Sequence, residues 1–226
     1  MIHHIEGPAG RLEALLDEPG PCASTGVARN EEEARRPSPV RARAVVVLAH
    51  PHPLHGGSMH TKLVFRVAKA FCGLGCAVLR FNFRGVGTSQ GSFDDGPGEM
   101  DDFRKAVDHV LVRYPGSDVW ACGVSFGAWV AMNVGATDDR VSRLVGIATP
   151  AARYDFSAVR TSSKPKFLVH GEVDEVAPLS DARRFYASAA EPKELVVIEM
   201  ADHLFDGRIA EVVDAIDGLL GGQDGP

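Results

Sequence analysis

From residue 44 onward, continuous apolar runs alternate with segments in which apolar residues recur every three or four positions. A short run that is apolar at nearly every position is typical of a strand buried on both faces of a sheet, and the longer spacing is typical of a helix with one buried face. We expect strands at 44–49, 76–81, 118–122, 143–148, 166–170 and 194–199. We expect helices at 61–71, 99–114, 128–135, 180–190 and 207–220.

Strands that alternate with helices of this length predict an α/β fold with a mostly parallel central sheet covered by helices on both faces. Residues 1–16 have a different pattern, with apolar and polar residues alternating around Gly7-Pro-Ala-Gly10. That pattern predicts an antiparallel hairpin at one edge of the sheet. The complete sheet is therefore expected to have about eight strands.

Two segments lack the apolar residues that a packed element needs. Residues 17–42 are rich in Pro, Gly and Ser and carry a run of charged side chains, so we expect a mobile, solvated loop there. Residues 221–226 are expected to form a disordered tail. The rest of the chain has the length of a single α/β domain, and we assign residues 1–226 to one domain.

The charge and the cysteine content of the chain restrict the classes of partner and the cellular compartment that we expect. The chain of 226 residues has a formal net charge of −6, which argues against binding to nucleic acid or to an anionic membrane surface. No apolar run is long enough to span a bilayer, and the first residues do not resemble a secretory signal. The four cysteines show no metal-site or disulfide spacing, so we expect a protein of the reducing cytoplasm.

The sequence Gly123-Val-Ser125-Phe-Gly127 lies between an expected strand and an expected helix. A serine at such a sharp strand-to-helix turn projects its hydroxyl away from the sheet, and it needs small residues two positions to either side. The start of the helix adds free N–H groups and a positive dipole end. Gly-x-Ser-x-Gly is common by chance in a chain with 24 glycines, so a nucleophilic role for Ser125 requires partner residues.

A nucleophilic serine requires a base, and the base requires an acid that orients it. In a sheet of this kind, the acid and the base follow the serine in that order, each in a loop after a strand. Asp174 follows the strand at 166–170, and His203 follows the strand at 194–199. We therefore assign Ser125, Asp174 and His203 as catalytic residues. Nearby carboxylates that could replace the acid are Glu172, Glu175 and Asp181.

Acyl transfer also needs two N–H donors for the oxyanion. One is expected from the residue after the nucleophile, Phe126, and the other from the loop after the first parallel strand, residues 50–57. Two prolines in that loop have no N–H, so the candidates are His52, Leu54 and the glycines 56–57. By position we choose the N–H of His52, with Leu54 second.

No cofactor or metal is expected. The histidines within and just after the 50–57 loop match no standard zinc spacing, and neither a carboxylate nor a cysteine accompanies them. The histidines concerned are His50, His52, His55 and His60.

The glycine-rich segment 84–91 lacks the lysine of a phosphate-binding loop, so we interpret it as structural support, with Arg84 in an ion pair.

Several motifs together resemble the compact, lidless bacterial α/β-hydrolases related to dienelactone hydrolases and small carboxylesterases. They are His-Pro-His-Pro-x-x-Gly-Gly at 50–57 and the Arg- and Gly-rich segment at 80–93, together with 123–128, 155–157 and 171–175. The resemblance extends from about residue 44 to 215, whereas the segment 17–42 is longer than this pattern suggests. It implies a triad of Ser125, Asp174 and His203, and a serine hydrolase reaction.

The segment between the strands at 143–148 and 166–170 is too short for a cap domain, so we expect an open cleft with an apolar rim. Together these features favour a serine hydrolase that cleaves a small or short-chain carboxylic ester through an acyl-enzyme. An acyltransferase or thioesterase on the same triad, or a non-catalytic binding protein with this fold, are the alternatives. The expected substrate-binding residues are Leu54, Tyr154, Phe156 and Leu204.

Overall fold

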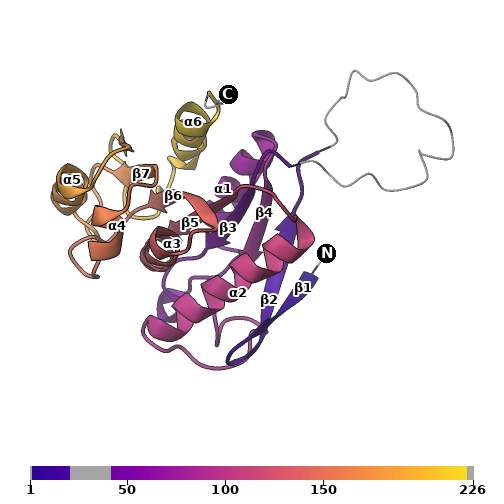
Figure 1. The fold of residues 1–226 in the computed structure, drawn as a ribbon. Helices are drawn as coiled ribbons and strands as arrows, with labels where there is room; N and C mark the ends of the chain where they lie inside the picture. Colours follow the sequence, from indigo (N-terminus) through magenta and orange to yellow (C-terminus); the bar gives the residue numbers. More distant parts are fainter. Residues whose placement is uncertain (1, 21–41, 223–226) are drawn as a thin grey trace, which may run out of the picture.

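The computed structural model of the protein describes residues 2–20 and 42–222 (Figure 1). The predicted loop at 17–42 and the predicted tail at 221–226 lie mostly outside this part of the chain. None of the described helices is long and apolar enough to cross a membrane.

An eight-stranded sheet forms the centre of the molecule, as predicted. The strands occur across the sheet in the order β1-β2-β4-β3-β5-β6-β7-β8. β1 and β2 form the predicted antiparallel hairpin at one edge, β2 is antiparallel to β4, and all other pairs are parallel. Their bounds are β1 Ile2–Gly7, β2 Gly10–Asp17, β3 Val45–Ala49, β4 Ala77–Phe81, β5 Val119–Val124, β6 Val141–Ile147, β7 Lys166–Gly171 and β8 Lys193–Ile198.

Five helices lie where the apolar spacing predicts them, and two shorter elements were not predicted. The short elements span one or two turns, too few for a periodic pattern to be visible in the sequence. The helices are α1 Lys62–Gly73, α2 Pro97–Arg113, α3 Phe126–Thr137, α5 Leu179–Ser188 and α6 Ile209–Leu220. The short elements are the 3-10 turn η2 Pro53–His55 and the helix α4 Ser157–Thr161. Among residues 2–20 and 42–222, none forms a cap domain over the sheet.

Both faces of the sheet are buried, which explains the continuous apolar runs. In β3, Val45 and Val47 belong to the core that contains α2 and α3, whereas Val46 and Leu48 point to the opposite core, where α1 packs against α6. Figure 1 shows α2 crossing one face of the sheet. Because every second side chain enters a different core, a polar residue at any of these positions would leave a buried polar group in one of them.

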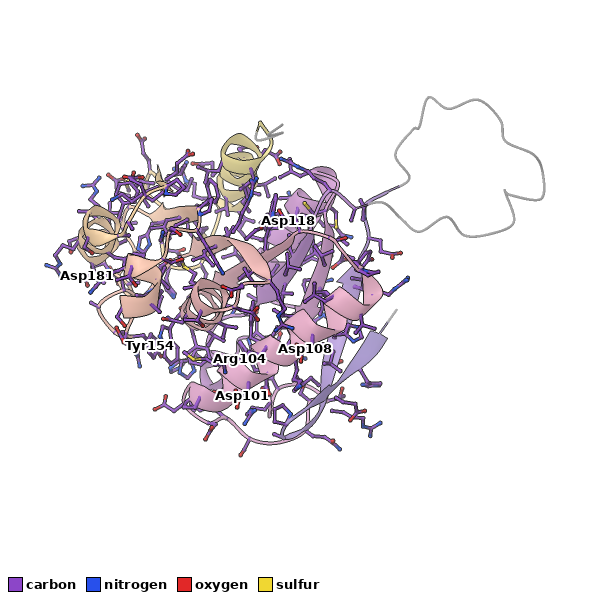
Figure 2. The ribbon with its side chains drawn as sticks, viewed as in Figure 1. Asp101, Arg104, Asp108, Asp118, Tyr154 and Asp181 are labelled. Carbon is purple, nitrogen blue, oxygen red and sulfur yellow. The ribbon has the colours of Figure 1, made fainter. Side chains whose placement is uncertain are left out.

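The glycine-rich segment after β4 is anchored by a buried ion pair, as predicted. Arg84 Nη2 lies 2.8 Å from Asp102 Oδ1, and the Nε and backbone N–H of Arg84 both donate to Asp102 Oδ2 at 3.0 Å. The carboxylate is fully buried on α2. Along the exposed side of the same helix, Asp101, Arg104 and Asp108 form only surface ion pairs (Figure 2), which contribute little to stability.

The strand order reverses direction at β3, which has β4 on one side and β5 on the other. Ligand sites in such sheets form at this point, just beyond the carboxyl ends of the strands. The loops that follow β3, β5, β7 and β8 all leave the sheet at this same edge. The fold therefore brings the loops that carry the predicted site residues together at one edge of the sheet.

Candidate active site

Ser125 occupies a strained turn between β5 and α3, with φ 55° and ψ −120°. A positive φ is uncommon for a residue other than glycine, and here the N–H of Ser125 is held by the carbonyl of Ile147 at 2.8 Å. A Cβ atom at Gly123 would overlap the carbonyl oxygen of Gly127, and one at Gly127 would overlap that of His50. Both glycines of the motif are therefore required because backbones pass too closely for a side chain.

The three residues predicted to be catalytic form a hydrogen-bonded chain. Ser125 Oγ lies 2.8 Å from His203 Nε2, and His203 Nδ1 lies 2.8 Å from Asp174 Oδ2. An ionised carboxylate can only accept a hydrogen bond, so Nδ1 carries the proton of the neutral imidazole. The lone pair of Nε2 is then directed at the hydroxyl of Ser125, which is the arrangement that a general base needs.

Asp174 is fixed in its turn and kept ionised. Its Oδ1 accepts the N–H groups of Val176 at 2.9 Å and Ala177 at 2.7 Å, which leaves Oδ2 for His203. Burial raises the pKa of this carboxyl, but the hydrogen bonds from His203 and from Ala177 outweigh burial, and the net pKa lies below the ordinary value. The group is therefore a carboxylate at neutral pH.

The other nearby carboxylates have different partners. Glu172 accepts the N–H of Met200 at 3.0 Å, and Asp181 is paired with Arg184 in the first turn of α5 (Figure 2). Glu175 is exposed. None of the three is hydrogen-bonded to His203 within the described part of the chain, so the geometry favours Asp174 as its partner.

A cavity of about 270 Å³ opens above Ser125. Two of the four residues predicted to bind substrate, Tyr154 and Leu204, line it. The ring of Tyr154 is stacked on Trp129, with the centroids 4.4 Å apart and an interplanar angle of 16°, which fixes its position (Figure 2). The complete lining is Pro51, His52, His55, Ser125, Phe126, Pro150, Arg153, Tyr154, Val176, His203 and Leu204.

Comparisons with known proteins identify the family. The family model Hydrolase_4, described as "Serine aminopeptidase, S33", matches residues 41–162, which is more than half of the chain. The chain belongs to this α/β-hydrolase family. The uncharacterized protein RP471 of Rickettsia prowazekii is 31% identical over 226 residues, which cover 96% of this chain and 87% of that protein.

Two solved structures agree with this assignment. XC6422 from Xanthomonas campestris, described as an α/β serine hydrolase without a lid, has a TM-score of 0.83 and 32% identity, with 96% of this chain and 92% of that chain covered. A serine hydrolase homologue from Coxiella burnetii has a TM-score of 0.84 and 34% identity, with 97% of each chain covered. The predicted resemblance to compact, lidless α/β-hydrolases is confirmed.

The other two residues predicted to bind substrate do not line the cavity of this hydrolase. Phe156 is only 1% exposed and packs against Phe185, with ring centroids 5.1 Å apart, so its placement at the rim was wrong. The short helix α4, which starts directly after Phe156, turns that ring into the core. Leu54 is 69% exposed and is not among the residues that line the cavity. Conversely, Arg153 and Val176 line the cavity, but no motif in the sequence marks them.

The loop after β3 contributes a tight turn beside Ser125. Leu54 N–H donates to His52 Nδ1 at 3.2 Å, so the second-choice oxyanion donor is already engaged. Within residues 2–20 and 42–222, the backbone N–H groups of His52 and Phe126 have no acceptor, and both residues line the cavity that contains Ser125. These two groups are therefore free beside Ser125, whereas Leu54 N–H and Gly57 N–H, which donates to the carbonyl of His52 at 3.1 Å, are engaged.

His50 anchors that loop to the body of the hydrolase. Its side chain is fully buried, Nδ1 donates to the carbonyl of Pro51 at 2.6 Å, and Nε2 accepts the N–H of Phe83 at 3.1 Å. Burial lowers the pKa of His50 to about 4, so the ring is neutral under ordinary conditions. Both ring nitrogens already have partners. Among the described residues, no group of three or more His, Cys, Asp or Glu side chains is arranged to hold a metal ion.

The buried neutral ring of His50 predicts a loss of stability on mild acidification. Between its ordinary pKa of 6.5 and its folded pKa of about 4, the unfolded chain binds a proton that the folded chain does not, so stability falls as the pH falls. From pH 7 to pH 5, the free energy of unfolding of the native protein should drop by about 2 kcal/mol more than that of His50→Gln, which lacks the titrating ring. Urea unfolding at both pH values measures this, and equal drops would contradict it.

His170 is a supporting residue that the sequence did not mark as part of the site. The ring is buried at the end of β7, and its Nε2 donates to the carbonyl of Ala177 at 2.7 Å, 3.6 Å from Asp174 Oδ2. Burial lowers its pKa, so the ring stays neutral beside the carboxylate. It fastens the turn 174–177, whose N–H groups orient Asp174.

Proposed function

We propose that the protein is a serine esterase that cleaves a small or short-chain carboxylic ester through an acyl-enzyme on Ser125. The observation that carries this proposal is the hydrogen-bonded chain from Asp174 through His203 to Ser125, which ends in an open cavity. An aligned base and a fixed acid are what a serine hydroxyl needs to become a nucleophile. A protein that only binds a ligand has no need of that alignment.

In the first half of the reaction, His203 Nε2 takes the proton of Ser125 while Oγ bonds to the carbonyl carbon of the ester. The carbonyl electron pair moves to the carbonyl oxygen and forms an oxyanion. When this intermediate collapses, the bond between the carbonyl carbon and the leaving oxygen breaks. The imidazolium gives its proton to that oxygen, so an alcohol departs and the acyl group stays on Ser125.

In the second half, His203 Nε2 takes a proton from water as the water oxygen bonds to the acyl carbon. The bond from that carbon to Ser125 Oγ then breaks, and Oγ recovers the proton from the imidazolium. A carboxylic acid is released and the enzyme is regenerated. Asp174 stabilises the imidazolium in both halves without itself taking up a proton.

The oxyanion is stabilised in this proposal by the N–H groups of Phe126 and His52. Both belong to residues that line the cavity, and both lack another acceptor in the described part of the chain. Phe126 is also the first residue of α3, so the positive end of the helix dipole lies beside the developing charge. Donors that are in place before the reaction need no reorganisation when the charge forms.

The lining of the cavity favours an ester over the free N-terminus of a peptide, although the family description names an aminopeptidase. A peptide ammonium needs a carboxylate close to the scissile bond. No carboxylate lines the 270 Å³ cavity among the residues that the structure describes, and the charged side chain there is the guanidinium of Arg153. This environment repels a cation. The small volume also suits a short acyl group, because drug-sized ligands occupy about 300–1,000 Å³.

An experiment with competing acceptors separates hydrolysis from acyl transfer on the same triad. The enzyme is mixed with p-nitrophenyl acetate in buffer alone, with 1-butanol, or with a small thiol, and the acetyl products are quantified. We expect acetate to match the released p-nitrophenolate one to one in buffer and to remain the main product with either acceptor. If butyl acetate or the thioester takes up most of the acetyl groups, the protein is an acyltransferase instead.

A further inference from the structure

A second and larger hollow adjoins the cavity above Ser125. It is a groove of about 750 Å³ between the start of α1 and the loops that carry Asp174 and His203. The two hollows share three lining residues, Val176, His203 and Leu204, whereas Ser125 lines only the smaller one. The groove therefore starts at the imidazole of His203 and continues away from the nucleophile.

The chemistry of the reaction determines which of the two hollows holds the acyl part of the ester and which holds the alcohol part. His203 must give its proton to the leaving oxygen, so that oxygen has to lie within hydrogen-bond reach of Nε2. The carbonyl oxygen has to point the other way, toward the free N–H groups of Phe126 and His52. An ester held in this way has its alcohol part on the side of His203, where the groove opens, and its acyl part in the smaller cavity.

We propose that this groove binds the alcohol part of the substrate, and that this part is apolar, extended, and either uncharged or positively charged. The inference rests on the proposed esterase function and adds the substrate class. The walls of the groove include apolar side chains that are unusually exposed for their type: Val173 at 44%, Val176 at 60% and Leu204 at 42%. A bound alkyl or aryl chain removes these surfaces from water, which is favourable in proportion to the area covered.

The charges around the groove restrict the alcohol further. Glu175, Asp202 and Asp206 line it together with a single cation, Lys62. Within the described chain, no ion pair neutralises these acidic groups. Lys62 also lines a separate hollow, with Arg66, that does not include His203. Carboxylates therefore outnumber cations in the lining of the groove, and this excess of negative charge disfavours an alcohol that ends in a carboxylate or phosphate.

The proposal predicts an asymmetry between two isomeric esters. Hexyl acetate and ethyl hexanoate have the same atoms and similar leaving-group reactivity, but the long chain is on the alcohol in one and on the acyl group in the other. We expect kcat/KM for hexyl acetate to be at least about 10-fold higher, because four additional methylene groups leave water in the groove. Acid release in a pH-stat measures both esters.

A matched pair of variants connects that ratio to the groove. Val173→Asp places a carboxylate on the groove wall and should lower the ratio of hexyl acetate to ethyl hexanoate by at least about 5-fold, because the ligand must then desolvate a charge. Val112→Asp makes the same change at a valine on α2 that is 85% exposed and lines neither hollow, so the ratio should not change.

The preference against a negatively charged alcohol is tested with two acetate esters of equal length. One alcohol ends in a trimethylammonium group and the other in a carboxylate. At low ionic strength, the cationic ester should have at least about a 3-fold higher kcat/KM, and added salt should reduce the difference. Equal rates, or a preference for the anionic ester, would overturn the assignment of charge.

The outcomes also separate this inference from the function on which it rests. An enzyme that is active on p-nitrophenyl acetate but hydrolyses ethyl hexanoate as fast as hexyl acetate, or hydrolyses neither, overturns the groove assignment alone. An unaltered ratio in Val173→Asp does the same. Absence of any activity on p-nitrophenyl acetate, together with no fluorophosphonate adduct on Ser125, overturns both proposals.

Discussion

Ser125→Ala is expected to lower kcat for p-nitrophenyl acetate by about 10⁵-fold or more. Without Oγ no acyl-enzyme can form, and the remaining rate comes from water held near the N–H donors of Phe126 and His52. The substitution keeps the Cβ atom, so the backbone stays at the same φ of 55° and the turn between β5 and α3 has no reason to change. Steady-state kinetics at saturating substrate measures the effect.

Two controls make the result specific. The free energy of unfolding of Ser125→Ala should stay within about 0.5 kcal/mol of that of the native protein, which shows that the fold is intact. Ser180→Ala removes an exposed hydroxyl on α5 and should retain full activity. If Ser125→Ala keeps more than a small fraction of the native rate, then Ser125 is not the nucleophile.

Asp174→Asn is expected to lower kcat by about 10⁴-fold while leaving the site folded. Oδ1 of the native carboxylate accepts two backbone N–H groups, from Val176 and Ala177, so the carbonyl oxygen of the asparagine should remain there. Its NH₂ group then faces His203 Nδ1 and donates to it. The imidazole is forced into the tautomer with the proton on Nε2, which cannot accept the proton of Ser125.

The matched control is Asp181→Asn, which makes the same change at the paired carboxylate in the first turn of α5 (Figure 2). This variant should differ from the native enzyme by less than about 2-fold, because a surface ion pair contributes little. Similar losses in both variants would mean that Asp174 acts through general stability. A rate near the native one in Asp174→Asn would show that His203 is oriented by another group.

The sequence was sufficient to predict the sheet, its hairpin edge and the five longer helices, because in each of them many residues follow one repeating pattern of apolar and polar positions. The loops with Ser125, Asp174 and His203 could be predicted as well, since the order of strands fixes which loops meet at one edge. The hydrogen bonds of 2.8 Å within that set agree with this prediction.

The lining of the cavity could not be predicted from the sequence to the same degree. Phe156 is an apolar aromatic residue of the kind expected at the rim of a cleft, but it lies in the core, directly before the short helix α4. No periodic pattern in the sequence reveals a helix of that length. The prediction for Leu54 is affected in a similar way, since this residue lies in the short turn η2, which the sequence pattern does not reveal, and is exposed there. The groove beside His203 depends on how three distant segments pack against one another, and local sequence does not encode that contact.

His50 and His170 show a further limit of sequence patterns. Neither was predicted to act as a ligand or a base, and both are buried: both ring nitrogens of His50 and the Nε2 of His170 are hydrogen-bonded to backbone groups. What they do is hold the loop after β3 and the turn 174–177 in place. Its position after the last strand singles out His203 in the sequence, but the hydrogen bonds across the chain that define the supporting roles of His50 and His170 are visible only in the folded structure.

Labelling with a fluorophosphonate, followed by intact mass and peptide mapping, shows whether Ser125 is an activated nucleophile. The reagent reacts only with a serine whose hydroxyl is activated, so it reports the nucleophile without any assumption about the substrate. We expect one adduct per chain, located on Ser125, absent in Ser125→Ala and formed far more slowly in His203→Ala. A native protein that stays unlabelled, or that carries its adduct on another residue, would contradict the proposed serine mechanism.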